Sequence, residues 1–284
     1  MALELGCNTL FPHENFPNPD TFTLDKLRIS LDRIAALGFD ATEFSHYMHL
    51  SEEDATAAGE YCRSLGIIPW SGHSAGSAAV STPEQREKTL ADKRLCLRLA
   101  KALGVQVMVY HVATYDANVY RDGLPEQLLA EESAVLADLA AEAADLGLRI
   151  AIENGNTVGI MTYLVALVDR VDSPALGICV DTGHAALGDL GPGRAIRMAG
   201  ERLFTLHLQD NWGGVDHHLP PGCGRINWCD VAAALAEVRY DGVLMAELTD
   251  SPMGNRPYHK ELELHIAAST LWRLRENIRS AAPR

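Results

Sequence analysis

Short apolar runs alternate with longer amphipathic stretches from one end of the chain to the other. The first run covers residues 3–7, and over 23–38 leucine and isoleucine recur every three or four positions until Gly38. Short apolar runs predict buried strands, and helical spacing predicts helices with one buried face. The expected strands cover 3–7, 39–44, 66–73, 105–111, 148–153, 175–181, 202–210 and 240–247. The expected helices cover 23–38, 51–66, 83–103, 125–146, 160–171, 193–199, 227–240 and 259–278.

The order of these elements predicts the fold class. Strands that alternate with helices form a parallel sheet with right-handed crossovers, and eight such pairs suit a closed (β/α)8 barrel. A doubly wound open sheet is the alternative, but no GxGxxG motif follows the first expected strand. Because no linker rich in Pro, Gly or Ser divides the chain, we expect an α/β protein with a single TIM-barrel domain over residues 1–284.

Composition narrows the range of partners. The net charge of −14, from 24 basic and 38 acidic residues, opposes nucleic-acid binding, which relies on Lys and Arg at phosphates. No apolar run reaches the roughly 18 residues that a membrane span needs, and the amino-terminal residues lack the pattern of a signal peptide. The six cysteines contain no CxxC pair, so we expect them to be reduced. These features favour a cytoplasmic protein.

A polar residue stands at the end of each expected strand, and in a barrel all these ends meet at one mouth. Three carboxylates and one imidazole from four consecutive strands would converge there. Without a cation the three carboxylates would repel one another, and at least one of them would have to be protonated. A divalent ion (Mn, Co, Mg, Fe or Zn) removes the conflict, although an imidazole ligand weighs against Mg. The residues that end the eight strands in turn are Asn8, Glu43, His73, His111, Glu153, Asp181 with the nearby His184, His207 and Glu247.

Asp181 alone has an ordinary alternative. A carboxylate at a strand end is often a cap for the following helix or turn. Asp181 indicates a metal site only because Glu153, His207 and Glu247 are expected to lie close to it.

Five motifs in chain order resemble the xylose-isomerase-like TIM-barrel superfamily. They are IENGN (152–156), VDTGH (180–184), LHLQD (206–210), HHLPPGCGRINW (217–228) and AELTD (246–250). The superfamily includes sugar-phosphate isomerases and epimerases, ketose 3-epimerases, inosose isomerases and dehydratases, and endonuclease IV. The resemblance implies metal ligation by Glu153, Asp181, His207 and Glu247. It also implies proton transfer by Glu153 and Glu247 and contact between His184 and a substrate oxygen.

We therefore expect a metal-dependent isomerase or epimerase of a small sugar, ketose or cyclitol that works through an enediolate. One divalent ion is expected, with no organic cofactor. Metal-dependent dehydration of a cyclic polyol ketone is the alternative, because the same proton abstraction can be followed by loss of hydroxide. Related barrels often pair, so the resemblance also implies a homo-oligomer.

Endonuclease IV supplies a rival hypothesis, because it binds three zinc ions with further histidines and an Asp-x-His pair. This chain has counterparts at His73, His111, His184, and at Asp216 and His218 around His217. These residues are candidates for additional metal ligation or for substrate contact. The alternatives are that His73 and His111 are histidines satisfied within the fold, and that Asp216 and His218 anchor the loop. The acidic net charge and Cys223, where the resembled families often carry Glu, weigh against the phosphodiesterase.

The remaining candidates concern the substrate. Trp70, Trp212 and Phe11 are candidates for an apolar wall, and Asn154 for orienting the site. Glu43 could bind a distal hydroxyl or support the site from behind, and Arg225 could reach a phosphate or a hydroxyl or form a surface ion pair. The polar segment 213–224, rich in Gly and Pro, is a candidate lid.

Overall fold

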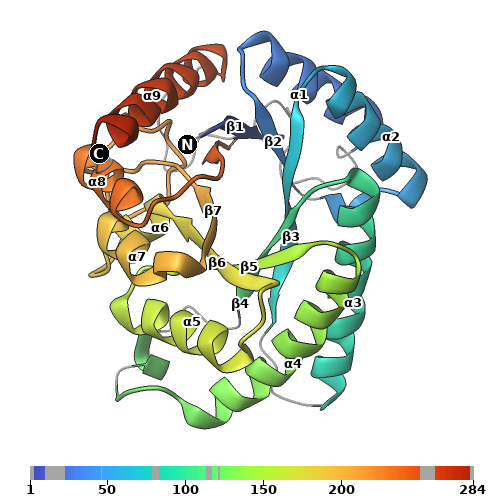
Figure 1. Ribbon diagram of the computed structural model, residues 1–284, viewed down its shortest axis with the longest axis vertical. Helices are drawn as coiled ribbons and strands as arrows, with labels where there is room; N and C mark the ends of the chain where they lie inside the picture. Colours follow the sequence, from blue (N-terminus) through green and yellow to red (C-terminus); the bar gives the residue numbers. More distant parts are fainter. Residues whose placement is uncertain are drawn as a thin grey trace.

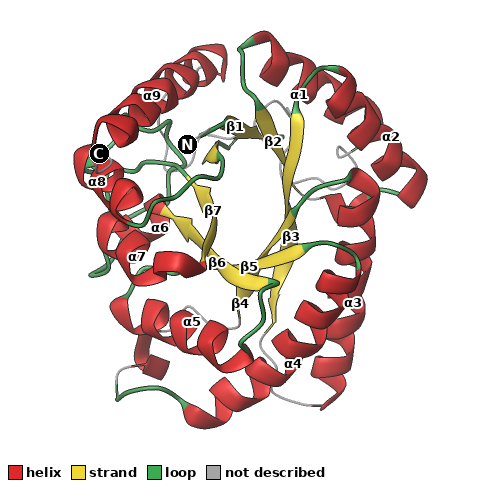
Figure 2. Ribbon diagram, viewed as in Figure 1, coloured by secondary structure: helices red, strands yellow, loops and turns green. Residues whose placement is uncertain are grey.

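Eight parallel strands form the centre of the protein, and helices surround them (Figures 1 and 2). The computed structural model describes residues 3–9, 23–45, 47–78, 83–112, 117–120, 122–249 and 260–281. The strands are β1 (Leu5–Asn8), β2 (Ala41–Ser45), β3 (Ile68–Ala78), β4 (Val107–Val112), β5 (Arg149–Glu153), β6 (Leu176–Asp181), β7 (Leu203–His207) and β8 (Leu244–Ala246). The predicted (β/α)8 barrel is confirmed.

The outer layer consists of helices that follow the strands in the chain. They are α1 (Leu24–Ala36), α2 (Glu52–Ser64), α3 (Pro83–Leu103), α4 (Glu126–Asp145), α5 (Val158–Val171), α6 (Thr182–Ala186), α7 (Pro192–Ala199), α8 (Trp228–Glu237) and α9 (Lys260–Ala281). Short 3-10 helices η2 (Tyr47–His49), η3 (Ala117–Tyr120) and η4 (Gly200–Arg202) lie between them. The helix α6 was not predicted, because it directly continues β6 and has only five residues.

Polar side chains begin several of these helices. Thr23, Ser51 and Thr157 each accept a hydrogen bond from the backbone N–H three residues later, at the start of α1, α2 and α5. Such caps satisfy amide groups that have no partner inside the helix. The three hydroxyl side chains therefore help to fix where these helices begin.

The strand order is β7-β6-β5-β4-β3-β2-β1-β8, so each strand from β1 to β7 pairs with its neighbours in the chain. Between β7 and β8 the pairing is reduced to one parallel bridge, Leu208 with Ala246. The Leu208 amide donates to the Met245 carbonyl at 2.7 Å, and the Glu247 amide donates to the Leu208 carbonyl at 3.1 Å. This short seam closes the barrel.

Side-chain alternation along the strands prepares the site. Residues i and i+2 of a strand point to the same face. Small and apolar side chains fill the barrel interior, among them Val109, Ala151 and Cys179. The polar residue two positions further along the same strand points inward one layer higher, at the carboxyl ends of the strands. Such pairs are Val109 and His111, Ala151 and Glu153, Cys179 and Asp181, and Met245 and Glu247.

Three strand ends differ from the prediction. Glu43, His73 and His111 do not end their strands, because β2 continues to Ser45, β3 to Ala78 and β4 to Val112. The register between β2 and β3 also shifts: Thr42 pairs with Pro69 and Glu43 with Ser71, so that Trp70 has no partner on β2. A bulge of this kind turns side chains to a face that simple alternation would not give them.

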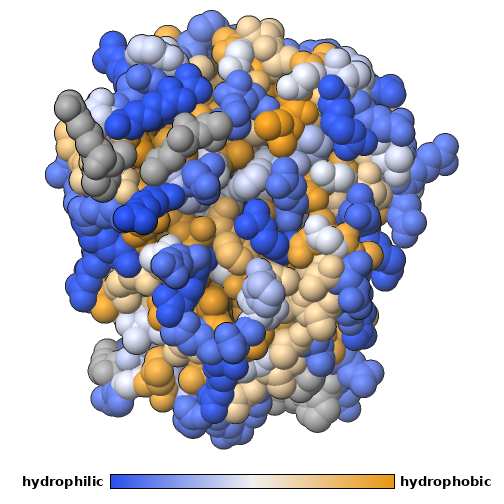
Figure 3. Space-filling view, viewed as in Figure 1, coloured by the Kyte–Doolittle hydropathy of each residue, from blue (hydrophilic) through white to orange (hydrophobic). Residues whose placement is uncertain are grey.

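The surface is mixed in hydropathy. Hydrophilic residues dominate the rim of the face seen in Figure 3, and hydrophobic residues show mainly between them. Among the described residues, no helix has both the length and the apolar character needed to cross a membrane. All six cysteines are free thiols, four of them buried, as the sequence predicts.

Candidate metal centre

The four residues expected to bind a metal lie together at the mouth of the barrel. Glu153, Asp181 and His207 are the last residues of β5, β6 and β7, and Glu247 follows β8 directly. One ligand atom from each lies within 4.8 Å of the others, and all four residues are buried. The convergence predicted from the strand ends is therefore present in the fold.

Three atoms of this group face one another without hydrogen bonds. His207 Nδ1 lies 3.3 Å from Glu153 Oε1 and 3.5 Å from Glu247 Oε2. None of the three has a hydrogen-bond partner within the described part of the chain. A tetrahedral cation with bonds of about 2.0–2.1 Å keeps its ligand atoms about 3.3 Å apart. The spacing and donor set of these atoms thus fit a divalent metal ion.

Asp181 has two roles at once. Its Oδ1 accepts a hydrogen bond from the His184 amide at 2.7 Å and caps α6. Its own amide donates to Asn154 Oδ1 at 2.7 Å, which fixes the end of β6. Burial, together with the charges of Glu247 and Glu153, raises the pKa of Asp181 to about 8. The cap and the metal ligand were alternatives for the sequence, and the geometry allows both.

Glu43 supports His207 from behind. His207 Nε2 lies 2.9 Å from Glu43 Oε2, which also accepts a hydrogen bond from Ser71 Oγ at 2.7 Å. A carboxylate on one imidazole nitrogen holds the proton there and leaves the other nitrogen free to bind a metal. Glu43 is fully buried and bonds to His207, a position that fits support of the site better than contact with a distal hydroxyl.

A second cluster shares Glu153. The Nε2 atoms of His73 and His111 each lie 3.2 Å from Glu153 Oε2 and 3.0 Å from each other. These three atoms also have the proximity needed to hold a metal ion. Burial raises the pKa of Glu153, but His111, His207 and His184 outweigh it and hold that pKa well below its usual range.

A third cluster lies in the loop after β7. Asp216 Oδ2 lies 3.2 Å from His184 Nε2 and 3.0 Å from His218 Nε2. Against the effect of burial, these two imidazoles lower the pKa of Asp216. On its other side, His184 Nδ1 lies 3.2 Å from Glu153 Oε1. All the residues expected as additional metal or substrate contacts therefore reach the same mouth.

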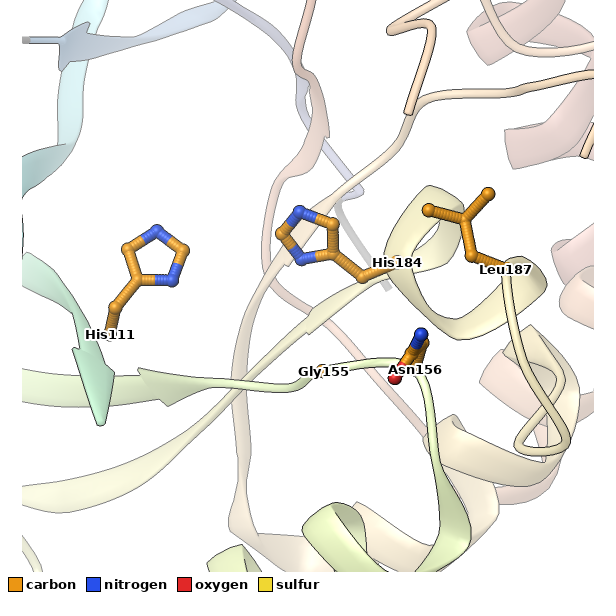
Figure 4. A pocket seen from close by; sticks show the side chains of 5 residues that line it. All are labelled: His111, Gly155, Asn156, His184 and Leu187. Carbon is orange, nitrogen blue, oxygen red and sulfur yellow. The ribbon is translucent and has the colours of Figure 1, made fainter. Parts of the chain in front are cut away.

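A cavity of about 260 Å³ opens beside these clusters. His111 and His184 face it from β4 and α6, and Gly155, Asn156 and Leu187 complete its wall (Figure 4). Both imidazoles lie 3.2 Å from a carboxylate oxygen of Glu153, so a small molecule in the cavity would lie against the candidate metal centre.

Some expected residues lie elsewhere. The expectation that Trp70 lines the mouth is wrong: its Nε1 donates to Thr205 Oγ1 at 2.9 Å, and its ring stacks near Arg149 at the amino-terminal end of the barrel. Trp212 is 51% exposed and donates to the Cys223 carbonyl. Arg225 is exposed and reaches the Ala186 carbonyl at 3.5 Å.

Two other expectations concern support of the site and the substrate wall. Phe11 lies outside the described residues. Asn154 is buried and bonds both to the end of β6 and to the Gly155 carbonyl, which fits its expected orienting role. Ser71 and Gln209 were not among the predicted site residues. Their signal was weak but present, since Ser71 stands two positions before His73 on β3, and Gln209 stands two positions after His207, the last residue of β7.

The comparisons with known proteins agree with this architecture. A model of the xylose isomerase-like TIM barrel domain matches residues 31–268. The chain belongs to this family. One relative in the family, the uncharacterized protein y4fM of Sinorhizobium fredii, is 27% identical over 292 residues, which cover 100% of this chain and 90% of the relative. The D-psicose 3-epimerase of Enterocloster bolteae is 24% identical over 230 residues, covering 76% of this chain and 75% of that protein.

Solved structures of other proteins have the same fold. A D-tagatose 3-epimerase-like protein superimposes with a TM-score of 0.76 at 24% identity, covering 98% of this chain and 99% of that one. An L-ribulose 3-epimerase superimposes with a TM-score of 0.77 at 17% identity, covering 98% and 96%. At such identities the likeness shows the xylose isomerase-like barrel and leaves the substrate open.

Proposed function

We propose that this chain is a divalent-metal-dependent isomerase or epimerase of a small sugar, a ketose or a cyclitol. The observation that carries the proposal is the group of Glu153, Asp181, His207 and Glu247, whose ligand atoms converge within 4.8 Å. Two of its members are carboxylates that can also move a proton. Distant relatives include D-psicose 3-epimerases at 24–26% identity, which supports a ketose as the substrate class.

A divalent ion held by these four residues would polarise a substrate carbonyl and its neighbouring hydroxyl, which makes the C–H proton beside them more acidic. Glu153 and Glu247 are the residues that we assign to that proton. One carboxylate takes it from one face of the substrate, and the other returns a proton to the opposite face. Nearby imidazoles outweigh burial and lower the pKa of both carboxyls, so either one can take the proton. The carboxylate on the opposite face must first gain a proton from water before it can return one to the substrate, and the first carboxyl gives up its proton to water after the reaction.

The other residues hold the substrate and the metal ligands. We assign Asp181 and His207 to holding the metal, and Glu43 to holding His207. The cavity between His111 and His184 is the place for the polyol part of the substrate, because their ring nitrogens can bond to hydroxyl groups. We assign His184 to a substrate oxygen there.

The test uses chelator-treated protein reconstituted with Mn, Co, Mg, Fe or Zn and a panel of ketoses and cyclitols in D2O. We expect product formation and uptake of solvent deuterium at the epimerised carbon, both dependent on metal. Glu153→Gln and Glu247→Gln should each lower the rate by about 10²–10⁴-fold, since a positioned proton-transfer group contributes that much. The exposed Glu60→Gln is the control. Full activity in protein free of metal would refute the proposal.

Two other activities remain open to the same experiment. Dehydration would give a conjugated carbonyl that absorbs in the ultraviolet, whereas epimerisation would not. A phosphodiesterase with three zinc ions is a second candidate, favoured by the His73, His111 and Glu153 cluster and by Asp216 between His184 and His218. Elemental analysis separates the candidates: about one metal per chain supports the isomerase, while about three zinc ions with cleavage of an abasic duplex supports the phosphodiesterase.

A further inference from the structure

Gln209 separates two carboxylates at the mouth of the barrel. This fully buried residue lies two positions after His207. Its side-chain Nε2 lies 2.6 Å from Asp216 Oδ1 and 3.4 Å from Asp181 Oδ2. One carboxamide nitrogen therefore offers its two protons to two acids, one on β6 and one in the loop after β7.

The hydrogen-bond network decides which way the carboxamide points. The nitrogen must face Asp216 and Asp181, because the opposite orientation would press the amide oxygen against two carboxylates. The Gln209 Oε1 atom is then left buried, with no hydrogen-bond partner in the described residues. Leaving a buried acceptor unpaired costs free energy. The two hydrogen bonds from Gln209 Nε2 to Asp216 and Asp181 offset this cost.

The fold holds this carboxamide in one place. The backbone N–H of Gln209 donates to Thr182 Oγ1 at 3.1 Å, and the same hydroxyl donates to the backbone carbonyl of Gln209 at 2.7 Å. Next to it, a Cβ at Gly183 would overlap the Gln209 carboxamide. The glycine thus leaves the slot into which the side chain fits.

What Gln209 holds is Asp216, and Asp216 holds two histidines. With Oδ1 on Gln209, the Oδ2 atom of Asp216 lies between His184 Nε2 and His218 Nε2, at 3.2 and 3.0 Å. Asp216 directly follows an exposed stretch of this loop, in which Trp212 and Val215 are 51% and 43% exposed. We propose that Gln209 is a positioning residue that seats Asp216 between His184 and His218 and ties the loop to the metal ligand Asp181.

Asp210 fastens the same loop by a separate set of bonds, which provides a control. Its carboxylate accepts hydrogen bonds from the Gly222 amide, the Ile226 amide and Trp228 Nε1 at 3.1, 3.2 and 2.9 Å. The polar partners of Asp216 are different groups, on Gln209, His184 and His218. Loosening the loop through Asp210 therefore differs from unseating Asp216 through Gln209.

The first experiment requires no activity and no metal. In protein labelled with ¹⁵N-histidine, Gln209→Met keeps the volume of the side chain and removes its donors. The resonances of His184 and His218, assigned by single substitutions, should move, while those of the distant His49 and His265 should stay. The exposed Gln127→Met is the matched control and should move none. Unchanged His184 and His218 resonances in Gln209→Met would overturn the proposal.

The second experiment rests on the proposed function and tests whether the two residues act as one unit. Gln209→Met and Asp216→Asn should each lower kcat about tenfold or more with KM changed less than threefold. The double variant should be no slower than Asp216→Asn alone, because both changes unseat the same carboxylate. Independent, multiplying effects would overturn the proposal. Asp210→Asn should instead combine multiplicatively with Gln209→Met. If no substrate is turned over at all, the proposed function fails while the histidine spectra still decide the role of Gln209.

Discussion

The buried carboxylate of Glu43 orients the imidazole of His207 at this site. Both side chains are fully buried, where an isolated carboxylate would be costly. Glu43 avoids that cost by accepting from Ser71 and from the imidazole of His207. The result is a histidine whose Nδ1 lone pair is presented to Glu153, Glu247 and any cation between them.

Replacing Glu43 should weaken metal binding although it touches no metal. In Glu43→Gln the charge behind His207 is lost, so its Nδ1 becomes a poorer ligand. Metal affinity should fall by about 10–100-fold, the usual effect of removing a partner of a metal-bound histidine. Titration with Mn²⁺ against a competing chelator measures it.

Ser71→Ala is the matched variant, because it removes one donor and leaves the Glu43 carboxylate on His207. Its affinity should stay within about threefold of the wild-type value. Wild-type affinity in Glu43→Gln would show that Glu43 has no influence on the ligand.

At the same scale, the sequence predicted the inward-facing set and missed its supports. Alternation along β5 and β6 was enough to place Glu153 and Asp181, because those strands are regular up to their last residue. It failed for Trp70, because β3 begins at Ile68 and continues to Ala78, so this side chain lies near the amino-terminal end of the strand. How far a strand continues beyond its apolar run depends on pairing with its neighbours, which a single sequence does not show.

At the scale of elements, close packing between α2 and α3 depends on one glycine. Gly59 is buried on α2, and a Cβ there would overlap the carbonyl oxygen of Leu103, the last residue of α3. Because that atom belongs to the backbone, the helices cannot relieve the overlap by changing a rotamer.

Gly59→Ala should therefore destabilise the barrel. In a helix interior alanine normally gains about 0.5–1 kcal/mol over glycine. Overpacking costs about 1–3 kcal/mol, so the overlap should win. Urea unfolding measures the difference. The exposed Thr56→Ala on the same helix should change stability by no more than about 0.5 kcal/mol. A Gly59→Ala protein more stable than wild type would contradict the packing.

The elements themselves were largely predictable, because eight apolar runs and the stretches between them follow the two periods that strands and helices require. The helix α6 was missed since its five residues carry too little pattern, and its cap, Asp181, was already assigned to a strand. The loop after β7 was expected as a lid. Its hydrogen bonds to Asp210 depend on contacts distant in sequence, which composition does not indicate.

On the scale of the whole molecule, the mouth concentrates opposite charges. Five carboxylates and five imidazoles meet there: Glu43, Glu153, Asp181, Asp216 and Glu247, with His73, His111, His184, His207 and His218. The net charge of −14 therefore includes acids that are arranged around a candidate cation site rather than around solvent.

Metal should stabilise the entire fold through this mouth. A ligand at 100 times its Kd stabilises the native state by about 2.7 kcal/mol, so Mn²⁺ should raise the unfolding temperature by several degrees. In Asp181→Asn the rise should vanish, because a metal ligand and its charge are lost. The metal-free variant should unfold no earlier than metal-free wild type, since Asn caps α6 as well as Asp does. Differential scanning calorimetry with and without Mn²⁺ tests both. An undiminished rise in the variant would exclude Asp181 as a ligand.

The single bridge between β7 and β8 gives the circle of strands one weak joint. His207 and Glu247 stand immediately beside it, one on each strand end. A ligand that binds both side chains links β7 to β8 and so replaces the hydrogen bonds that are missing between these strands. Opening of the closed ring, the motion that would admit water to its interior, would then require the ligand to leave first. A ligand bound in the mouth would therefore keep the barrel closed as well as take part in the reaction.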